Sequence, residues 1–425
     1  MAGTTIEWYD FFIYALCAGL VFSTQFFRGL GQDSLIISFA TIGISFFFRP
    51  VGAALAGHLG DRLGRRAMLI LTLLLMGVST TLIGLVPTTD SIGAGAPVIL
   101  VVLRIVQGLS AGGEWGGAAL ISVEHAPPNR RGTYGAYPQL GAPIGLLLAN
   151  GVLAAVTAVT THEQFMTWGW RVPFLLGVLL IAVGFVIRRR VEESPVFKEL
   201  KGSGRQPRTP LAALFKNHWP LVAAGTLLFA ANNAVGYMTT GGYVQSYSVK
   251  VLGIPPTTIL IAVMIAAVGW LISTLAGGRL SDKIGRVMVY RVGFIIQLVW
   301  MFPFLALLNT ANVTLVVLSL IVYSIGLGLT YGPQAALFSE MYPTAVRYSG
   351  AALSYALGAV LGGAFAPVIA EALESSTHTV YSVGVYLAAV TTVGLIVTFA
   401  LKDRAGVSLS DVANDETETV GAGVH

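Results

Sequence analysis

Long apolar runs, separated by short polar segments, are the dominant pattern of this sequence. A helix needs roughly 20 apolar residues to cross a bilayer, and twelve runs bounded by polar, proline or glycine clusters are close to that length or exceed it. They cover about residues 6–28, 35–57, 67–87, 97–122, 133–158, 170–188, 219–247, 256–279, 288–308, 312–338, 348–372 and 380–401. We therefore predict an all-α integral membrane protein with twelve transmembrane helices.

Composition supports this interpretation. Of the 425 residues, 55% are hydrophobic and 11% are charged, whereas roughly 25% of the residues in an ordinary soluble domain are charged. The net charge of +5 comes from short basic patches between apolar runs, which are typical of topology signals rather than of a nucleic-acid surface. The expected partners are the lipid bilayer and a small molecule, and not a nucleic acid.

Cysteine and histidine offer no metal site. The single cysteine, Cys17, excludes an internal disulfide, and the six histidines fall at or near predicted span ends or loops. The chain begins without a basic leader or a small-residue cleavage site, so we interpret the first apolar run as a retained span and not as a signal peptide.

The chain divides into two halves of six spans. The longest polar interruption runs from Arg188 to Lys216 and carries eight basic residues. We predict an N-terminal half at 1–190, a cytoplasmic linker at 191–216, a C-terminal half at 217–401 and a cytoplasmic tail at 402–425.

The two halves repeat each other in sequence. The segment GHLGDRLGR at 57–65 is matched by GRLSDKIGR at 278–286, between the second and third spans of each half. Glu124, Pro127 and Arg131 have the same spacing as Glu340, Pro343 and Arg347. Two such halves, related by an axis along the membrane normal, indicate a transporter with its substrate site between the halves at mid-depth.

Lysine and arginine fix the expected orientation. They are concentrated in the loops after spans two, four, eight and ten, in the linker and in the tail. The opposite side of the membrane has three: Arg28, Arg171 and Lys250. By the positive-inside rule, both termini are cytoplasmic in a bacterial-type plasma membrane.

Several motifs give the chain a resemblance to the major facilitator superfamily over essentially its whole length. The loop at 57–66 resembles that superfamily's best-known motif, and the repeated Glu-x-x-Pro-x-x-x-Arg resembles its sugar-porter-like branch. Further motifs are similar to the metabolite:proton symporter family: EWYDF at 7–11, FRPVG at 48–52, RIVQG at 104–108, GGEWGG at 112–117 and WGWRVPF at 168–174. The run EWGGAAL at 114–120 looks closest to shikimate-transporter-like members.

This resemblance implies uptake of carboxylates or zwitterions together with protons. Separately, we expect the protein to be a monomer. Family members usually begin with a basic segment and one or two further helical turns, whereas six residues precede Glu7 here. Either the true start lies upstream of Met1, or the first span is short.

Charged residues at the predicted cytoplasmic helix ends are candidates for a gate. They serve at least as topology anchors, because their side chains reach water, and the resemblance implies that they also hold the halves closed during alternating access. The sequence suggests Glu124 with Arg131, and Glu340 with Arg347, as partners. The gating candidates are Asp61, Arg65, Arg66, Glu124, Arg131, Asp282, Arg286, Glu340 and Arg347.

Arg104 is the strongest single candidate for substrate binding. It lies within span four among valine, leucine and isoleucine, and a charge there costs roughly 2.5–3.5 kcal/mol on insertion scales. It either pairs with a carboxylate of span one or takes a substrate carboxylate bidentately, a task that suits arginine better than lysine.

Three carboxylates within the predicted spans are candidates for proton coupling: Asp10, the first choice, then Glu7, which also fits an interfacial partner of Asp10 or a gate residue, and Glu114. Glu7 and Asp10 are three residues apart and share a helix face, with Asp10 one turn deeper. Glu114 follows Gln107 by seven residues on one face of span four, among glycines that indicate close helix packing. Arg49, before Pro50, is interpreted as structural, with a freed carbonyl or a span-one carboxylate as its partner.

The C-terminal half has polar uncharged residues in place of intramembrane charges. We expect these residues to supply hydrogen bonds and aromatic walls, although each of them alone also fits a helix–helix contact. The predicted substrate-binding set is Arg104, Gln107, Asn232, Tyr237, Tyr331 and Gln334.

The prediction is a proton-coupled secondary transporter, and not an enzyme, that imports a small organic acid or related polar metabolite. The sequence lacks a phosphate-binding GxxxxGK[ST] loop, and we expect no cofactor besides the coupling proton. One alternative is a sugar or polyol transporter of the same fold, in which Arg104 forms an internal ion pair. An exporter is disfavoured because GAPIG at 141–145 matches the drug-antiporter motif only partly, and a nutrient sensor is disfavoured because the tail is short.

Overall fold

The computed structural model describes residues 1–28, 34–189, 210–240, 243–407 and 409. Most of the predicted linker and tail lie outside these ranges. The side chains of three predicted site residues, Asp61, Arg65 and Tyr237, also lie outside the described residues, although their helices are described.

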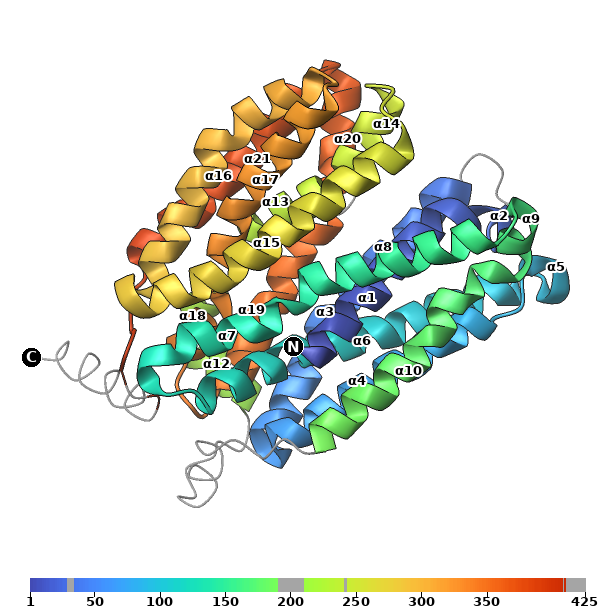
Figure 1. The fold of residues 1–425 in the computed structure, drawn as a ribbon. Helices are drawn as coiled ribbons and strands as arrows, with labels where there is room; N and C mark the ends of the chain where they lie inside the picture. Colours follow the sequence, from blue (N-terminus) through green and yellow to red (C-terminus); the bar gives the residue numbers. More distant parts are fainter. Residues whose placement is uncertain (29–33, 190–209, 241–242, 408, 410–425) are drawn as a thin grey trace, which may run out of the picture.

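The N-terminal half is a bundle of long helices joined by short connections (Figure 1). Short elements extend the first and sixth spans at the ends that lie away from the chain termini. The helices are α1 (Ala2–Cys17) with η1 (Ala18–Phe22) and α2 (Ser23–Gln25), α3 (Ser34–Leu63), α4 (Arg65–Leu85), α5 (Thr89–Ile92), α6 (Gly95–Glu124), η3 (Pro128–Arg130), α7 (Arg131–Gln139), α8 (Gly141–Val159), α9 (His162–Gln164), η4 (Phe165–Gly169) and α10 (Arg171–Arg189).

The C-terminal half repeats this pattern after α12, a short helix that begins inside the range predicted as linker and ends one residue beyond it. Its helices are α12 (Pro210–Asn217), α13 (Trp219–Thr240), α14 (Tyr243–Lys250), α15 (Pro256–Ile284), α16 (Arg286–Asn309), α17 (Val313–Tyr331), α18 (Gln334–Met341), α19 (Arg347–Ala359), η5 (Val360–Ala364), α20 (Ala366–Thr377) and α21 (Val380–Ala400).

Each predicted span corresponds to a helix or to a broken helix. Within the described ranges, nine helices are long and apolar enough to cross a membrane, and α9–η4 with α10 forms a tenth span bent by 47°. The remaining two predicted spans correspond to α13 with α14 and to α19, η5 and α20. The predicted membrane fold is therefore confirmed, with breaks that the apolar pattern does not reveal.

Two glycines account for the matching sharp turns in the halves. A single residue connects α3 to α4 and α15 to α16, and it is Gly64 in the first case and Gly285 in the second. Their φ angles are 114° and 94°, in a region that glycine enters at little cost and other residues avoid. The glycine shared by the repeated motifs is therefore required by backbone geometry.

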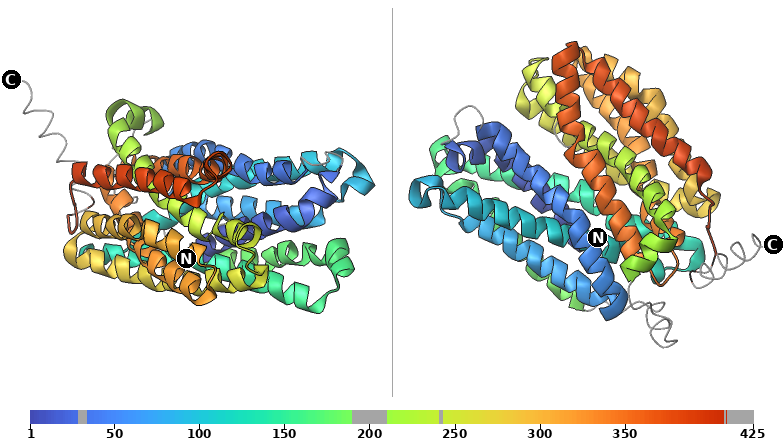
Figure 2. Two further views of the ribbon diagram at one scale, coloured as in Figure 1. Left: turned by 90° about the horizontal axis from the view of Figure 1, so that it is seen from above. Right: turned by 180° about the vertical axis from the view of Figure 1, so that it is seen from behind.

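The two bundles form a V. They converge where α7, α12 and α18 lie and spread apart toward α14 and α20 on one side and α2 and α9 on the other (Figures 1 and 2). We name the converging end, where α1 begins and α15 ends, the terminal end. Contacts between the halves join α19 to α3 and α6, and α7 to α15 and α18.

Glycines let the backbones approach closely inside the N-terminal half. A Cβ on Gly108 or Gly112 of α6 would collide with the backbone of α3 at Ser45 or Arg49, and a Cβ on Gly52 of α3 would collide with Leu109. Small residues at helix contacts are the usual means of tight packing in lipid. This seam holds Arg49 and Gln107 at fixed positions in the bundle.

We predict that Gly112→Ala separates α3 from α6. The new methyl group would meet backbone atoms, which cannot turn aside as a side chain can, so a cost of about 1–3 kcal/mol or more is expected. The melting temperature of the purified protein should fall. Gly151→Ala is the matched control, because a Cβ at Gly151 meets nothing within 4 Å. Equal melting temperatures for the two variants would contradict the proposed tight seam.

Candidate functional site

Asp282 of the C-terminal half caps a helix of the N-terminal half. Its carboxylate accepts hydrogen bonds from the backbone N–H of Gly132 at 2.7 Å and of Thr133 at 2.8 Å, and from the Thr133 hydroxyl at 2.7 Å. These donors belong to the first turn of α7, where the helix dipole favours a negative charge. Asp282 therefore holds the halves together, because it accepts hydrogen bonds from backbone N–H groups at the N-terminus of α7 in the other half.

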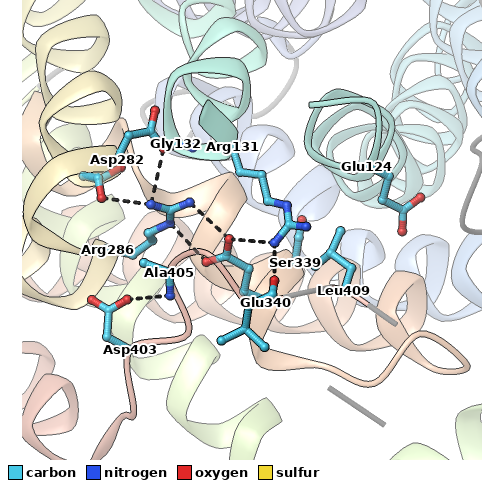
Figure 3. A network of polar contacts seen from close by, with 12 residues as sticks. Glu124, Arg131, Gly132, Asp282, Arg286, Ser339, Glu340, Asp403, Ala405 and Leu409 are labelled. Atoms are coloured by element: carbon cyan, nitrogen blue, oxygen red, sulfur yellow. Dashed lines mark hydrogen bonds and ion pairs between the residues drawn. The ribbon is translucent and has the colours of Figure 1, made fainter. Parts of the chain in front are cut away.

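Glu340 sits between arginines from both halves (Figure 3). Arg286 binds it with two hydrogen bonds, of 3.1 and 3.2 Å, and also lies 3.3 Å from Asp282. Arg131 of the N-terminal half approaches the same carboxylate at 3.7 Å. Since all four side chains are largely buried, the network is shielded from water and screening salt.

A second buried pair crosses the interface beside this network. The Arg347 guanidinium donates to Glu124 Oε1 at 3.3 Å. The sequence suggested pairs within each half, Glu124 with Arg131 and Glu340 with Arg347. The ion pairs observed here run crosswise, from Glu124 to Arg347 and from Glu340 to Arg131.

The beginning of the C-terminal tail completes the network. The Val407 carbonyl accepts a hydrogen bond of 2.5 Å from Arg131, and the Leu409 carbonyl accepts from Arg347 at 2.8 Å and from the Thr344 hydroxyl at 3.0 Å. Leu409 itself is buried. Sequence reasoning missed these contacts, because the acceptors are backbone carbonyls, which every residue has.

Six of the nine predicted gating residues thus come together at the terminal end: Glu124, Arg131, Asp282, Arg286, Glu340 and Arg347. Arg66 is half-buried at the start of α4. For Asp61 and Arg65 the side chains lie outside the described residues.

A second polar network lies within the membrane-spanning part of the N-terminal half. Asp10 of α1 accepts a 2.6 Å hydrogen bond from the Thr80 hydroxyl of α4, which in turn accepts one of 2.7 Å from Gln107 Nε2. Arg104, one turn from Gln107 on α6, donates to Gln107 Oε1 at 2.8 Å. Two neutral side chains therefore connect a buried carboxylate to a buried guanidinium.

Arg104 is held from its other side by an aromatic ring. Its guanidinium lies 3.7 Å from the centre of the Tyr14 ring, close enough for a cation–π interaction. The Tyr14 hydroxyl is 2.6 Å from the Thr41 hydroxyl. Sequence reasoning placed Asp10, Gln107 and Arg104 in this region but missed Thr80, because a threonine in an apolar span has no distinguishing signal.

The other two candidate carboxylates lie in separate surroundings. Glu114 accepts a 3.0 Å hydrogen bond from the Thr72 hydroxyl of α4. Glu7 forms an ion pair of 3.6 Å with Arg49 of α3, so a span-one carboxylate is the partner of this arginine.

In the C-terminal half, Asn232 and Gln334 form one network. Thr330 donates to Asn232 Oδ1 at 2.6 Å, and Asn232 Nδ2 lies 3.4 Å from Gln334 Oε1. Tyr331 lies with its ring 5.5 Å from that of Trp270, and its carbonyl accepts from Gln139 of the other half at 3.1 Å. The predicted residues of the two halves therefore occupy different networks, with Gln139 as one link between the halves.

A stack of three aromatic rings also crosses the interface. Trp115 of α6 stacks on Tyr355 of α19 with ring centres 4.0 Å apart, and Tyr355 stacks on Phe229 of α13 at 4.0 Å. The Trp115 indole donates to Gln139 Oε1 at 2.7 Å. Trp115 and Phe229 were not among the predicted residues.

We predict that Asp282→Asn loosens the terminal end. The change removes the charge that caps α7, and a hydrogen bond to a charged group contributes about 1.5–3 kcal/mol. The reporter is Ala336→Cys in a Cys17→Ser background, because Ala336 is fully buried between the halves. Labelling of this reporter by maleimide should become roughly tenfold faster, since 1.4 kcal/mol corresponds to a factor of ten.

The control for this experiment is Asp90→Asn, the same substitution at an exposed carboxylate of α5. It should leave the labelling rate unchanged. An unchanged rate in Asp282→Asn as well would show that the cap does not hold the end closed.

The fold agrees with that of solved transporters. A structure of the proton:xylose symporter XylE bound to a bromodeoxyglucose matches with a TM-score of 0.80 at 19% identity, covering 97% of this chain and 96% of that one. A structure of the inward-open XylE from E. coli matches with a TM-score of 0.70 at 19% identity, covering 97% of each chain. At this identity the likeness concerns the fold.

Relatives with higher sequence identity are metabolite transporters. The inner membrane metabolite transport protein YhjE of Escherichia coli K12 is 42% identical over 402 residues, covering 93% of this chain and 91% of the relative. The shikimate transporter of the same organism is 36% identical, covering 95% and 93%. The citrate–proton symporter of Klebsiella pneumoniae is 32% identical, covering 96% and 91%.

A family model agrees with both comparisons. The model of the Major Facilitator Superfamily matches residues 6–367. The expectation of a membrane transporter rather than an enzyme is thereby confirmed, as is the resemblance to metabolite symporters. The chain belongs to the Major Facilitator Superfamily.

Proposed function

We propose that this protein is a proton-coupled secondary transporter that imports a small organic acid or a related polar metabolite by alternating access. The observation that carries the proposal is the chain of hydrogen bonds from Asp10 through Thr80 and Gln107 to Arg104. It places a carboxylate that can take up a proton in the same network as a permanent positive charge.

Charge balance gives this network a means of coupling. With Asp10 ionised, its charge and that of Arg104 cancel. With Asp10 protonated, one positive charge remains in a medium where an uncompensated charge is costly. An anionic substrate bound nearby would restore neutrality, so a proton and a substrate carboxylate favour each other's binding. Glu7, on the next turn of α1, adds a further negative charge to the surroundings of Asp10.

The substrate class rests on this charge and on the relatives. A shikimate transporter and a citrate–proton symporter are 36% and 32% identical to this chain, and an organic acid fits the excess positive charge of the protonated network. The sequence-based prediction that Arg104 and Gln107 contact the anionic end of the substrate remains a prediction. The expectation that Asn232, Tyr237, Tyr331 and Gln334 form hydrogen bonds with the substrate also remains a prediction.

The orientation of the transport cycle follows from the distribution of lysine and arginine. We infer that the terminal end, with both chain termini, faces the cytoplasm. In this structure the terminal end is joined by the Asp282 cap and the crosswise ion pairs, and the opposite ends of the bundles spread apart (Figure 1). The structure then corresponds to an outward-facing state, and import requires that these contacts release.

A sugar or polyol is the second candidate substrate. The amide groups of Asn232 and Gln334 and the aromatic rings around Tyr331 favour it, because hydroxyl-rich solutes are bound by such groups. In that case Arg104 serves as an internal partner of Asp10. Competition of uptake by hexoses but not by organic acids would favour this candidate.

Uptake into proteoliposomes tests the function directly. Radiolabelled shikimate, α-ketoglutarate, citrate, glycine betaine and xylose would be offered with and without an inwardly directed proton gradient. We expect an organic acid to accumulate above equilibrium only with the gradient. Counterflow without gradient-driven accumulation would exclude symport.

Asp10→Asn tests the proposed proton carrier. The amide keeps the size of the side chain but takes up no proton, so gradient-driven accumulation should fall at least tenfold, while counterflow exchange of the same compound persists. Asp90→Asn is again the matched control and should accumulate normally. If Asp10→Asn still accumulates substrate in response to the gradient, the coupling proton binds elsewhere, with Glu7 and Glu114 as the next candidates.

A further inference from the structure

The ion pair between Glu7 and Arg49 lies outside the hydrogen-bonded chain that runs from Asp10 to Arg104. It joins α1 to α3 within the membrane-spanning part, and both side chains are buried, with relative exposures of 1% and 3%. A buried ion pair is often no more stabilising than a well-packed apolar pair of the same volume. Intramembrane charges are expected to serve a function.

The contact between these two charges is loose. Their closest N–O distance is 3.6 Å, whereas charge-assisted hydrogen bonds are about 2.7–2.9 Å long. Arg49 Nε is buried and has no hydrogen-bond partner among the residues that the structure describes. By contrast, the Arg286 guanidinium at the terminal end binds Glu340 through two hydrogen bonds of 3.1 and 3.2 Å. Arg49 therefore retains a donor that a second carboxylate can use.

The pair faces the C-terminal half. Tyr331 of α17 and Tyr355 of α19 are both within electrostatic range of Glu7 and of Arg49. The Phe46 ring, 4.7 Å from the Arg49 guanidinium, lies against η5 of the C-terminal half, where a Cβ on Gly363 would touch it at 3.1 Å. The charges thus lie at the boundary that alternating access must open.

Aromatic rings surround this boundary. The Phe11 ring is 5.4 Å from the Phe46 ring, and the Arg49 guanidinium lies 6.0 Å from the centre of the Phe11 ring. Tyr355 is the middle ring of the three-ring stack, between Trp115 and Phe229. Because Trp115 and Phe229 cover the two faces of Tyr355, the C-terminal half offers aromatic edges and tyrosine hydroxyls near the charged pair.

We propose that Arg49 binds the carboxylate of the transported substrate, with Glu7 as its counter-ion in the empty protein, and that the substrate is a compact monocarboxylate whose uncharged body lies against Tyr331 and Tyr355. This inference rests on the proposed function. A substrate carboxylate displaces Glu7 from the guanidinium and engages two of its N–H groups. A second or third carboxylate on the substrate would face aromatic rings and tyrosine hydroxyls, which suits one charge better than several.

The proposal also fits the charge balance of the N-terminal half. The Glu7–Arg49 pair is neutral, so a bound monocarboxylate adds one negative charge. A protonated Asp10 leaves one positive charge on Arg104. Proton and substrate therefore compensate each other from two sites, and the substrate need not contact Arg104.

Ligand binding to the purified protein, without any proton gradient, tests the proposal. The dissociation constants of shikimate, α-ketoglutarate, citrate, glycine betaine and sorbitol would be measured from the ligand-dependent rise in melting temperature at one fixed pH. We expect shikimate, the ring-shaped monocarboxylate, to bind most tightly. Arg49→Lys keeps the charge but loses the fork of donors, so its dissociation constant for shikimate should rise at least tenfold.

Two variants serve as comparisons. Arg291→Lys is the matched control, because the Arg291 guanidinium also lies over a phenylalanine ring, Phe399, at 4.4 Å, but binds the Thr398 carbonyl of its own half. Its dissociation constant should match that of the wild type. Arg104→Lys separates the two candidate arginines: a rise in the dissociation constant with Arg104→Lys but not with Arg49→Lys would overturn the proposal.

Glu7→Gln provides an independent test by the sign of its effect. If Glu7 competes with the substrate for Arg49, its neutral replacement should lower the dissociation constant for shikimate at least threefold. If the Glu7–Arg49 pair is purely structural, Glu7→Gln should bind shikimate more weakly than the wild type or equally well. Either result would overturn the proposal. This variant also decides the question if Arg49→Lys does not fold.

The remaining outcomes separate this inference from the proposed function. Failure of every carboxylate to bind the wild-type protein, or tighter binding of sorbitol than of any acid, would overturn the inference. Arg49-dependent binding without gradient-driven accumulation would leave the inference standing and exclude the coupling.

Discussion

Inside a bilayer, an ionised side chain must be compensated by the protein itself, because lipid supplies neither water nor counter-ions. This constraint applies to three of the charged groups of residues described above. Asp10 and Arg104 are joined through Thr80 and Gln107, Glu7 lies beside Arg49, and Glu340 is held between arginines of both halves. In each network a change in one charge alters the energy of its partners, which is the condition for a transporter to respond to protons or substrates.

The networks differ in what they connect. The residues linked to Arg104 come from α1, α3, α4 and α6, all in one bundle, so this network can change its protonation without moving the halves. At the terminal end, the Arg131–Glu340 and Arg347–Glu124 ion pairs join the two bundles, so these two pairs must break if the halves rotate apart. The Glu7–Arg49 pair lies between these extremes, in one bundle but facing the other. In the function that we propose, this order is a route by which proton, substrate and gate are coupled.

Sequence patterns predicted the fold well, because apolar run length and repeated motifs are read directly from the chain. The twelve spans, the family and the helix ends with Asp282 and Arg347 follow from such patterns. The partners of these charges were less predictable. Crosswise pairing depends on how the bundles dock, and Thr80, Gln139 and the carbonyl of Val407 contribute through geometry that residue type does not encode. The interruption of α19 and α20 by η5 was likewise hidden within a continuous apolar run.

The use of Val407 and Leu409 carbonyls at the terminal end has a consequence for biosynthesis. Arg131 and Arg347 belong to helices that enter the membrane well before the last residues of the chain are made. Until the tail leaves the ribosome, these two guanidinium groups lack acceptors that they have in the finished protein. Full closure of this end is therefore a late event of synthesis, because it waits for the carbonyls of Val407 and Leu409.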